Sequence, residues 1–170
     1  MAKNCPDDFS TALPPYFRPY IASTKNVKAD GHCGFRAIAG QLGLGEDAWG
    51  QIRTDLLNEL TSDVNFYRDV FVENDHVERI IAALDCFTPT APFDKWFSLP
   101  AMGHLVATTY NVALVVISRQ VPLTYLPLRT APGPDPKLCC IGLINDNHFI
   151  EVSHHSILIM LNTIITVSNK

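Results

Sequence analysis

The sequence predicts a mixed α+β fold in which helices flank a small central β-sheet. The 170 residues are the usual size of a single domain, and a hydrophobic content of 47% is sufficient for a core. In the first half of the chain apolar residues recur at helical spacing, whereas the second half holds short continuous apolar runs. This change of spacing indicates helices followed by strands.

The first half contains three predicted helices. The first begins at Cys33, where apolar residues recur at spacings of three and four up to residue 42, and two glycines follow. The second covers 49–60 and the third covers 77–84, because both repeat the same apolar spacing. Each of these helices has one apolar face with which to pack against a sheet.

The second half supplies one more helix and the strands. Residues 98–110 suit a helix with Pro100 in its first turn. The run 111–118 is apolar almost throughout, which is typical of a central strand covered on both faces. Two further strands, 139–144 and 149–152, flank a short polar turn.

The charge balance and the cysteine count limit the partners and the compartment. A net charge of -4 and the lack of a basic stripe make nucleic acid a poor partner for this domain. The five cysteines are odd in number, form no C-x-x-C pair and follow no secretory leader. We therefore expect free thiols and an intracellular protein, cytoplasmic or nuclear.

Two terminal segments flank the predicted domain of residues 21–153. Residues 1–20 contain several prolines without periodicity, which predicts an irregular N-terminal arm. Residues 154–170 form an atypical apolar tail. Its apolar run, 157–167, is shorter than the roughly 20 residues that a membrane-crossing helix needs, so we expect no membrane association.

Cys33 is the first candidate for chemistry. The sequence Asp30-Gly31-His32-Cys33 places its thiol on a tight turn at the start of a predicted helix. Free backbone N–H groups at a helix start stabilise a thiolate and can hold an oxyanion, which suits a nucleophile. The alternative is an inert buried thiol, because free cysteine is among the most buried residue types.

A cysteine nucleophile needs a base, and His148 is the best placed of the six histidines. It joins a polar turn to a β-branched strand, and a rigid strand would fix the direction of its imidazole ring. The alternative interpretation is a surface turn histidine without a chemical role. His104 lies in an apolar helical segment, which is typical of a core position.

Three motifs follow one another in a specific order. They are Asp30-Gly31-His32-Cys33-Gly34-Phe35-Arg36-Ala37, then Leu99-Pro100-Ala101-Met102-Gly103-His104 with Asn111-Val112, and finally Asn147-His148-Phe149. Together they resemble the ovarian tumour (OTU) family of cysteine proteases, in particular plant forms related to Mutator-like transposases and far-red impaired response proteins. The resemblance implies an OTU-like, papain-type fold and hydrolysis of the isopeptide or peptide bond at the C-terminus of ubiquitin.

The same resemblance assigns roles to individual residues. It implies Cys33 as the nucleophile, His148 as the general base and Asp30 as the acidic member of the first motif. On physical grounds, backbone N–H groups of the loop Gly31, His32 and Cys33 are expected to receive the oxyanion. This chemistry requires no cofactor.

One position departs from the family pattern. Many members carry Asp or Asn two residues after the base to orient its ring, whereas this chain has Ile150, and Glu151 projects from the opposite side of the strand. The orienting group is left open between Asn147, an acid of the arm such as Asp7 or Asp8, and a backbone carbonyl. Since Ile150 offers no acceptor, we expect Ile150→Asn to raise kcat.

Zinc binding is the other chemistry that cysteine and histidine suggest. The adjacent pairs Cys139-Cys140 and His154-His155 lack the spacing of zinc ligands, and neighbouring strand residues point to opposite faces. We therefore expect no metal site.

Two functions from different classes remain. The first is a monomeric deubiquitinating thiol protease whose partner is ubiquitin or polyubiquitin. An acidic groove would hold the arginines of the ubiquitin tail; the candidates are Asp47, Asp55, Glu59 and Asp146. The second is a catalytically weak, transposon-derived module that binds ubiquitin or another protein without turnover, which the missing orienter favours.

Overall fold

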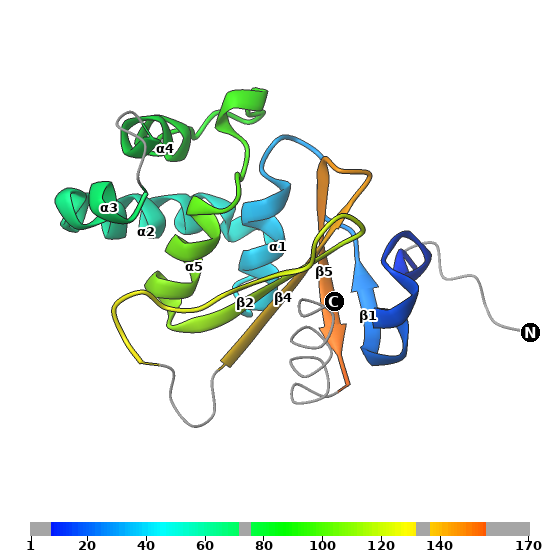
Figure 1. The fold of residues 1–170 in the computed structure, drawn as a ribbon. Coiled ribbons are helices and arrows are strands. Elements are labelled where there is room, and N and C mark those ends of the chain that lie inside the picture. Colours follow the sequence, from blue (N-terminus) through cyan, green and yellow to red (C-terminus); the bar gives the residue numbers. More distant parts are fainter. Residues whose placement is uncertain (1–7, 72–75, 132–136, 156–170) are drawn as a thin grey trace, which may run out of the picture.

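The apolar runs of the second half form the centre of a five-stranded mixed sheet (Figure 1). Its strands are β1 (Ile21–Lys25), β2 (Val112–Ser118), β3 (Leu123–Tyr125), β4 (Lys137–Ile144) and β5 (His148–His154). The computed structural model describes residues 8–71, 76–131 and 137–155, and within them the strand order is β1-β5-β4-β2-β3. β2 and β4 run parallel, whereas the other neighbours pair antiparallel.

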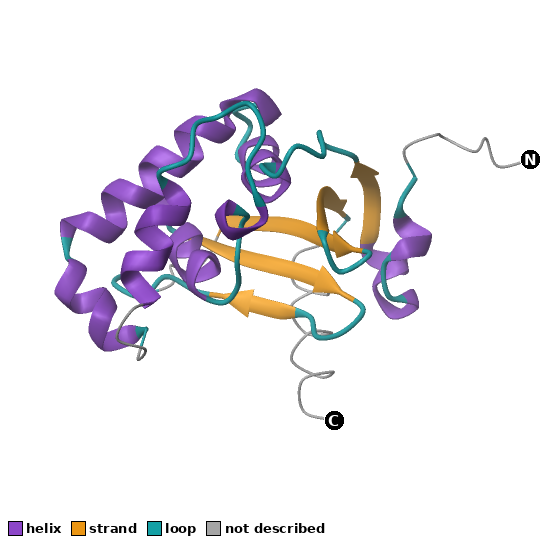
Figure 2. Cartoon of the chain, turned by 90° about the horizontal axis from the view of Figure 1, so that it is seen from above, coloured by secondary structure: helices purple, strands orange, loops and turns teal. Residues whose placement is uncertain are grey.

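The α-helices gather on one side of the sheet (Figure 2). They are α1 (Cys33–Gln41), α2 (Trp49–Ser62), α3 (Val64–Val70), α4 (His76–Leu84) and α5 (Ala101–Tyr110). Two short 3-10 helices, η3 (Glu46–Ala48) and η4 (Phe93–Lys95), lie in the connections between them. α1 packs directly on β4 and β5, so its first residue lies close to the end of the sheet.

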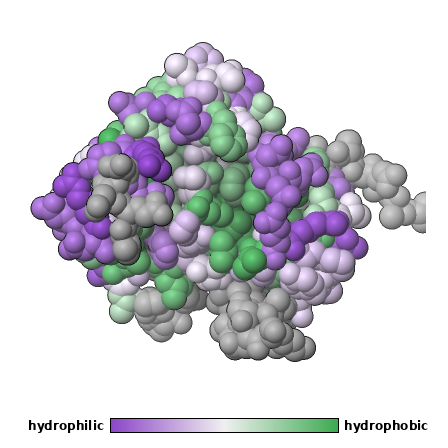
Figure 3. All heavy atoms as spheres, turned by 45° about the horizontal axis from the view of Figure 1, so that its top comes forward, coloured by the Kyte–Doolittle hydropathy of each residue, from purple (hydrophilic) through white to green (hydrophobic). Residues whose placement is uncertain are grey.

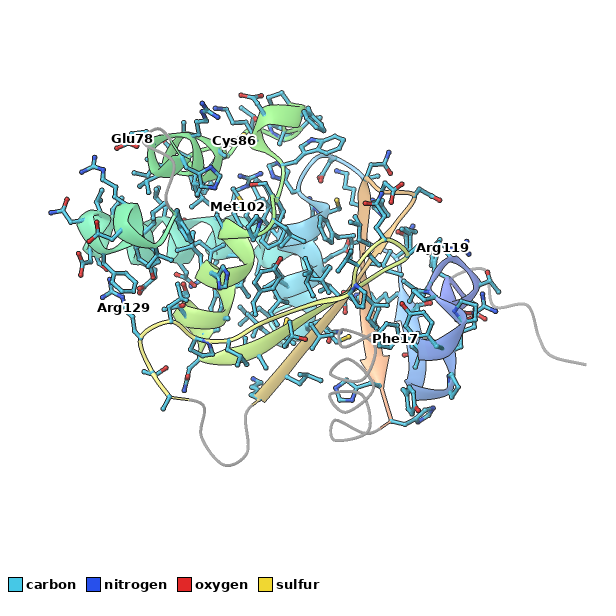
Figure 4. All side chains as sticks on the ribbon, viewed as in Figure 1. Phe17, Glu78, Cys86, Met102, Arg119 and Arg129 are labelled. Carbon is cyan, nitrogen blue, oxygen red and sulfur yellow. The ribbon has the colours of Figure 1, made fainter. Side chains whose placement is uncertain are left out.

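The opposite face of the sheet is covered by the N-terminal arm. Two 3-10 helices, η1 (Ser10–Ala12) and η2 (Pro15–Tyr20), stand where the sequence predicts an irregular segment. Leu13 and Phe17 are fully buried there. Arg119, at the end of β2, donates from Nε to a carbonyl of η1 over 2.9 Å, and Figure 4 shows Arg119 and Phe17 where the arm meets the sheet. Residues of the arm are therefore part of the core.

β2 confirms the prediction of a central strand buried on both faces. All of its residues are buried. Leu114 and Val116 pack into the cluster under the helices, whereas Val115 and Ile117 pack into the cluster under the arm. Because both faces of the sheet are covered, polar chemistry is confined to its ends and edges.

The predicted helices and the three predicted strands are confirmed, with small shifts at their ends. β1, α3 and β3 have no counterpart in the prediction, because each is too short to display a period. The apolar run 157–167 lies outside the described residues. None of the described helices has the length and apolar character that crossing a membrane requires.

Candidate active site

The turn before Cys33 requires a glycine. Gly31 has a φ of 86°, a left-handed conformation that favours glycine. A Cβ at Gly31 would lie 2.3 Å from the carbonyl oxygen of Ala91, so no larger side chain fits. Ala91 in turn donates its N–H to the carbonyl of Asp30 over 2.9 Å. The turn is therefore held directly against the segment that follows α4.

Asp30 shapes this turn with its side chain. Its Oδ1 accepts the backbone N–H of His32 at 3.1 Å, and its Oδ2 lies 2.7 Å from Nη2 of Arg36. Burial raises the pKa of Asp30, but the bonds from Arg36 and His32 outweigh it and hold the pKa below its usual value. Asp30 is thus a buried carboxylate that fixes the loop, and Arg36 makes a structural ion pair.

The ring of His32 is fully buried and neutral. Nε2 lies 2.9 Å from the carbonyl oxygen of Thr88, which can only accept, so Nε2 carries the proton. Nδ1 then accepts a bond from Nε of Arg53 at 3.1 Å, and the ring stacks on Trp49 with centroids 3.7 Å apart. Burial lowers the pKa of His32, which agrees with the neutral state.

Arg53 ties the turn to the helical side of the molecule. Besides His32, its guanidinium donates to the carbonyls of Ala83 and Lys95 over 2.7 and 2.8 Å. The group lies 3.9 Å from the centroid of Phe35, and burial lowers its pKa to about 10. Lys95 ends η4, so Arg53 connects the Cys33 turn to η4 through one side chain.

Cys33 is buried, with 8% of the residue exposed. Burial raises its pKa, whereas the backbone N–H groups of Phe149 and Gly34 lower the pKa by a smaller amount. The thiol is consequently protonated at neutral pH and needs a base to become a nucleophile. Among the described residues, no cluster of three or more His, Cys, Asp or Glu side chains is arranged to hold a metal ion.

The turn between β4 and β5 sets the position of His148. Asn145 and Asp146 have φ values of 51° and 58°, a left-handed conformation that these two residue types tolerate. The N–H of Asn147 closes the turn on the carbonyl of Ile144 at 3.3 Å. His148 then begins β5 directly opposite Ile144.

The ring of His148 is held by Asn26, which follows β1. Nε2 of His148 lies 2.8 Å from Oδ1 of Asn26. Burial lowers the pKa of His148, so the ring is neutral at neutral pH. Nothing in the sequence alone singles out Asn26, because its position depends on the pairing of β1 with β5.

The starts of α1 and β5 lie at the same end of the sheet (Figure 1). Phe149, the residue next to His148, lines the same cleft as Cys33, and its N–H lowers the pKa of the thiol. The structure thus brings the first and last motifs of the sequence together. Gly34 allows Phe97 to approach the start of α1, because a Cβ at residue 34 would lie 2.4 Å from Cβ of Phe97. The ring of Phe97 packs edge-on against Phe149.

Cys33 lies in a cleft of about 400 Å³. One wall comes from η4 and the residues after it, and the other from the β4–β5 turn; the lining residues besides Cys33 are Phe93, Asp94, Trp96, Phe97, Ser98, Leu99, Leu143, Asp146, Asn147 and Phe149. Figure 3 turns this end of the molecule forward and shows hydrophobic residues down the middle of the face between hydrophilic flanks. The cleft is therefore largely apolar, with two carboxylates on its walls.

Of the four acids considered for a groove, Asp146 alone lines this cleft. Asp47 pairs with Arg36, Asp55 accepts from Tyr110, and Glu59 accepts from Tyr67. The expectation for these three is corrected, because each belongs to a local contact of the helices. Asp94 also lines the cleft, and the sequence does not indicate it because it reaches the cleft only through the placement of η4.

The proposed orienting groups are placed as follows. Asn147 lines the cleft, and Asp8 accepts from the N–H of Ser10. Asp7 lies outside the described residues. The side chain of Ile150 is fully buried in the cluster under the arm, so it belongs to the core.

Comparison with solved structures finds OTU domains over most of the chain. The OTU domain of OTUD1 gives a TM-score of 0.58 at 15% identity, with 77% of this chain and 85% of that chain covered. The Hazara virus OTU, solved bound to ubiquitin, gives a TM-score of 0.60 at 9% identity, with 82% of this chain and 84% of that chain covered. An OTU deubiquitinase from Wolbachia pipientis wMel gives 0.55 at 14% identity and covers 85% and 99%. This chain has the fold of an OTU domain.

The likeness to OTU domains concerns the fold, since the identities are 9 to 15%. Neither a family model nor a curated protein sequence matches the chain. The predicted α+β class, with a central sheet and flanking helices, is confirmed by the OTU fold.

Proposed function

We propose that this OTU-fold chain is a cysteine-type deubiquitinase that cleaves the isopeptide or peptide bond at the C-terminus of ubiquitin. One observation carries the proposal: Cys33 begins a helix in a cleft that Asn147 and Phe149 also line, and the residue between these two is a neutral, hydrogen-bonded histidine, His148. The narrower likeness to plant proteins related to Mutator-like transposases rests on the sequence motifs alone.

The reaction uses groups of this chain only. His148 takes the proton of the Cys33 thiol, and the thiolate attacks the carbonyl carbon of the scissile bond. The tetrahedral intermediate collapses when His148 returns the proton to the departing amine, which leaves a thioester on Cys33. Water, deprotonated by His148, then releases the carboxylate and restores the thiol.

The oxyanion would be received in the turn before α1. The N–H of His32 is already bound to Asp30, so this residue shapes the loop. The N–H of Cys33 lowers the pKa of the thiol slightly. We assign the oxyanion to the N–H of Cys33, with Gly31 as the second residue of the loop that faces the intermediate.

The cleft suits an extended peptide tail. Phe97 and Phe149 make its floor apolar near Cys33, and Asp94 and Asp146 place negative charge on its walls. A tail with small residues beside the scissile bond and cationic residues further away complements this surface. The Hazara virus OTU was solved with ubiquitin, which carries such a tail.

Covalent capture by a ubiquitin probe with a C-terminal electrophile tests the proposal. The wild-type chain is expected to form a covalent adduct and to hydrolyse a C-terminal ubiquitin reporter. Cys33→Ala is expected to abolish both, and His148→Ala is expected to reduce turnover to a trace. Cys86→Ala is the matched control, because Cys86 is a buried free thiol at the end of α4 (Figure 4).

A ubiquitin-binding module without turnover is the second candidate. The observation that favours it is the burial of Cys33, which raises the thiol pKa. Binding of the probe without capture would establish this candidate and reject the protease. Turnover that survives Cys33→Ala would reject the assignment of the nucleophile.

A further inference from the structure

We propose that Asn26 is the positioning residue for His148 and that it fixes which ring nitrogen acts as the base. This inference rests on the proposed function for its catalytic meaning, and on the hydrogen bonds of β1 and β5 for its geometry. Asn26 supplies the orienting group that the sequence lacks at residue 150.

The strand pairing places Asn26 beside the missing group. Thr24 pairs with Val152 and Lys25 pairs with Glu151 in the antiparallel ladder of β1 and β5. One further step along this register sets Asn26 alongside Ile150. The residue directly after the neighbouring strand is thus an amide, and it lies next to the position where the family pattern puts an acceptor on the histidine's own strand.

The orientation of the Asn26 amide is fixed by a second contact. Its Oδ1 accepts the backbone N–H of Val27 at 3.0 Å, and an N–H group can only donate. The oxygen, and not the nitrogen, is therefore directed at both partners. Nε2 of His148 must then carry the proton that bridges 2.8 Å to Oδ1.

This arrangement leaves Nδ1 of His148 as the basic nitrogen. A neutral imidazole has one protonated and one unprotonated nitrogen, and Asn26 holds the proton on Nε2. The lone pair on Nδ1 is then available for the thiol proton in every molecule. Without Asn26 the ring could rotate and exchange tautomers, which would lower the competent fraction.

Asn26 is uncharged, and this decides the state of the resting site. An amide orients the ring without the electrostatic stabilisation that a carboxylate gives to an imidazolium. His148 accordingly stays neutral, and the Cys33 thiol stays protonated, until the carbonyl is bound. Asn26 is also solvent-exposed, so its replacement leaves the core untouched.

The tautomer can be measured on the unmodified protein. Histidine-labelled protein is examined by ¹⁵N NMR above pH 7, and the signals of His148 are assigned by their loss in His148→Ala. The expected spectrum has a protonated Nε2 and an unprotonated Nδ1. A ring protonated on Nδ1, or an equal mixture, would overturn the proposal without reference to any variant of Asn26.

Variants then separate positioning from structure. Asn26→Ala is expected to lower kcat on the ubiquitin reporter by about 10- to 100-fold, with KM changed less than about twofold. Asn26→Asp keeps the acceptor and adds a negative charge, so it is expected to retain more activity than Asn26→Ala. It is also expected to move the acid limb of the pH–rate profile upward by about one pH unit. Asn58→Ala, an exposed change on α2, is the control and should match wild type.

Alkylation of Cys33 by iodoacetamide, followed by mass spectrometry of its peptide, separates the two proposals. If ubiquitin is not cleaved but Asn26→Ala slows alkylation and mixes the tautomers, the proposed function fails and the positioning role stands. If ubiquitin is cleaved and a folded Asn26→Ala keeps wild-type kcat, alkylation and tautomer, the positioning role fails alone.

Discussion

Arg53 donates from Nε to Nδ1 of His32 over 3.1 Å, so a buried cation is held by a neutral ring. Its other described acceptors are the backbone carbonyls of Ala83 and Lys95. The bond makes the Cys33 turn depend on a side chain from the middle of α2.

Arg53→Met is expected to destabilise the fold by about 3 kcal/mol or more, because it leaves a ring nitrogen and two carbonyls without a donor. Urea unfolding measures the loss. Arg79→Met on α4 replaces an exposed arginine and should change the free energy of unfolding by less than about 0.5 kcal/mol. Equal effects of the two changes would contradict the role given to Arg53.

Acidification is expected to destabilise the protein through His32. Burial lowers the pKa of His32 in the folded state. Below about pH 6.5 this histidine therefore binds a proton in the unfolded chain but not in the folded chain. The free energy of unfolding therefore has its full value above that pH. It falls as the pH drops, by at most about 1.4 kcal/mol per pH unit for one proton. His32→Gln should flatten the fall between pH 7.5 and 5.5, whereas exposed His155→Gln should leave its slope unchanged.

Asp30→Ala is expected to cost about 3 kcal/mol, because the buried Arg36 loses its main partner. It should also lower kcat by about 100-fold, since the turn that we propose receives the oxyanion loses its anchor. Asp30→Asn keeps an acceptor for the N–H of His32 and should retain more activity. As a control, Asp47→Ala removes the exposed partner of Arg36 and is expected to cost less than about 1 kcal/mol. A silent Asp30→Ala would remove Asp30 from the site.

Ile150→Asn is now expected to destabilise the protein without raising kcat, which reverses the expectation from sequence. The side chain of Ile150 is fully buried among apolar residues. The substitution removes the packing of the isoleucine and buries an amide away from the water that would bond to it. We expect a loss of about 3 kcal/mol or more in urea unfolding. Ile150→Val should cost about 0.5 to 1.5 kcal/mol. A rise in kcat for a folded Ile150→Asn would show that Asn26 does not satisfy the ring.

Periodicity predicted most of the fold. α2 and β2 each bury a long, regular set of side chains, and such sets leave a clear pattern in the sequence. β1 is short and partly exposed, so its pattern is weak. β1 matters to the site through its pairing register with β5. The register between two strands that are distant in the sequence cannot be predicted from the sequence of either strand alone.

The candidate site divides in the same way. Cys33 and Asp30 lie on one continuous turn, and local rules for helix starts and glycine turns point to them. Asn26 and Asp94 reach the site through the pairing of β1 and the placement of η4, which are tertiary facts. The position of His148 between a polar turn and a strand made it the best-placed histidine, the motif resemblance implied its role as the base, and that role remains part of the proposal.

The two tryptophans of this chain occupy separate halves of the site. Trp49 stacks on His32 at 3.7 Å, and Trp96 stands in the cleft wall with its Nε1 bonded to the carbonyl of Ala91 at 3.0 Å. An indole stacked on imidazole is quenched when the imidazole gains a proton, whereas an indole in a cleft wall changes its emission when water is displaced. Intrinsic fluorescence can thus follow the protonation of the loop through Trp49 and the filling of the cleft through Trp96, and Trp96→Phe would separate the two signals without an attached dye.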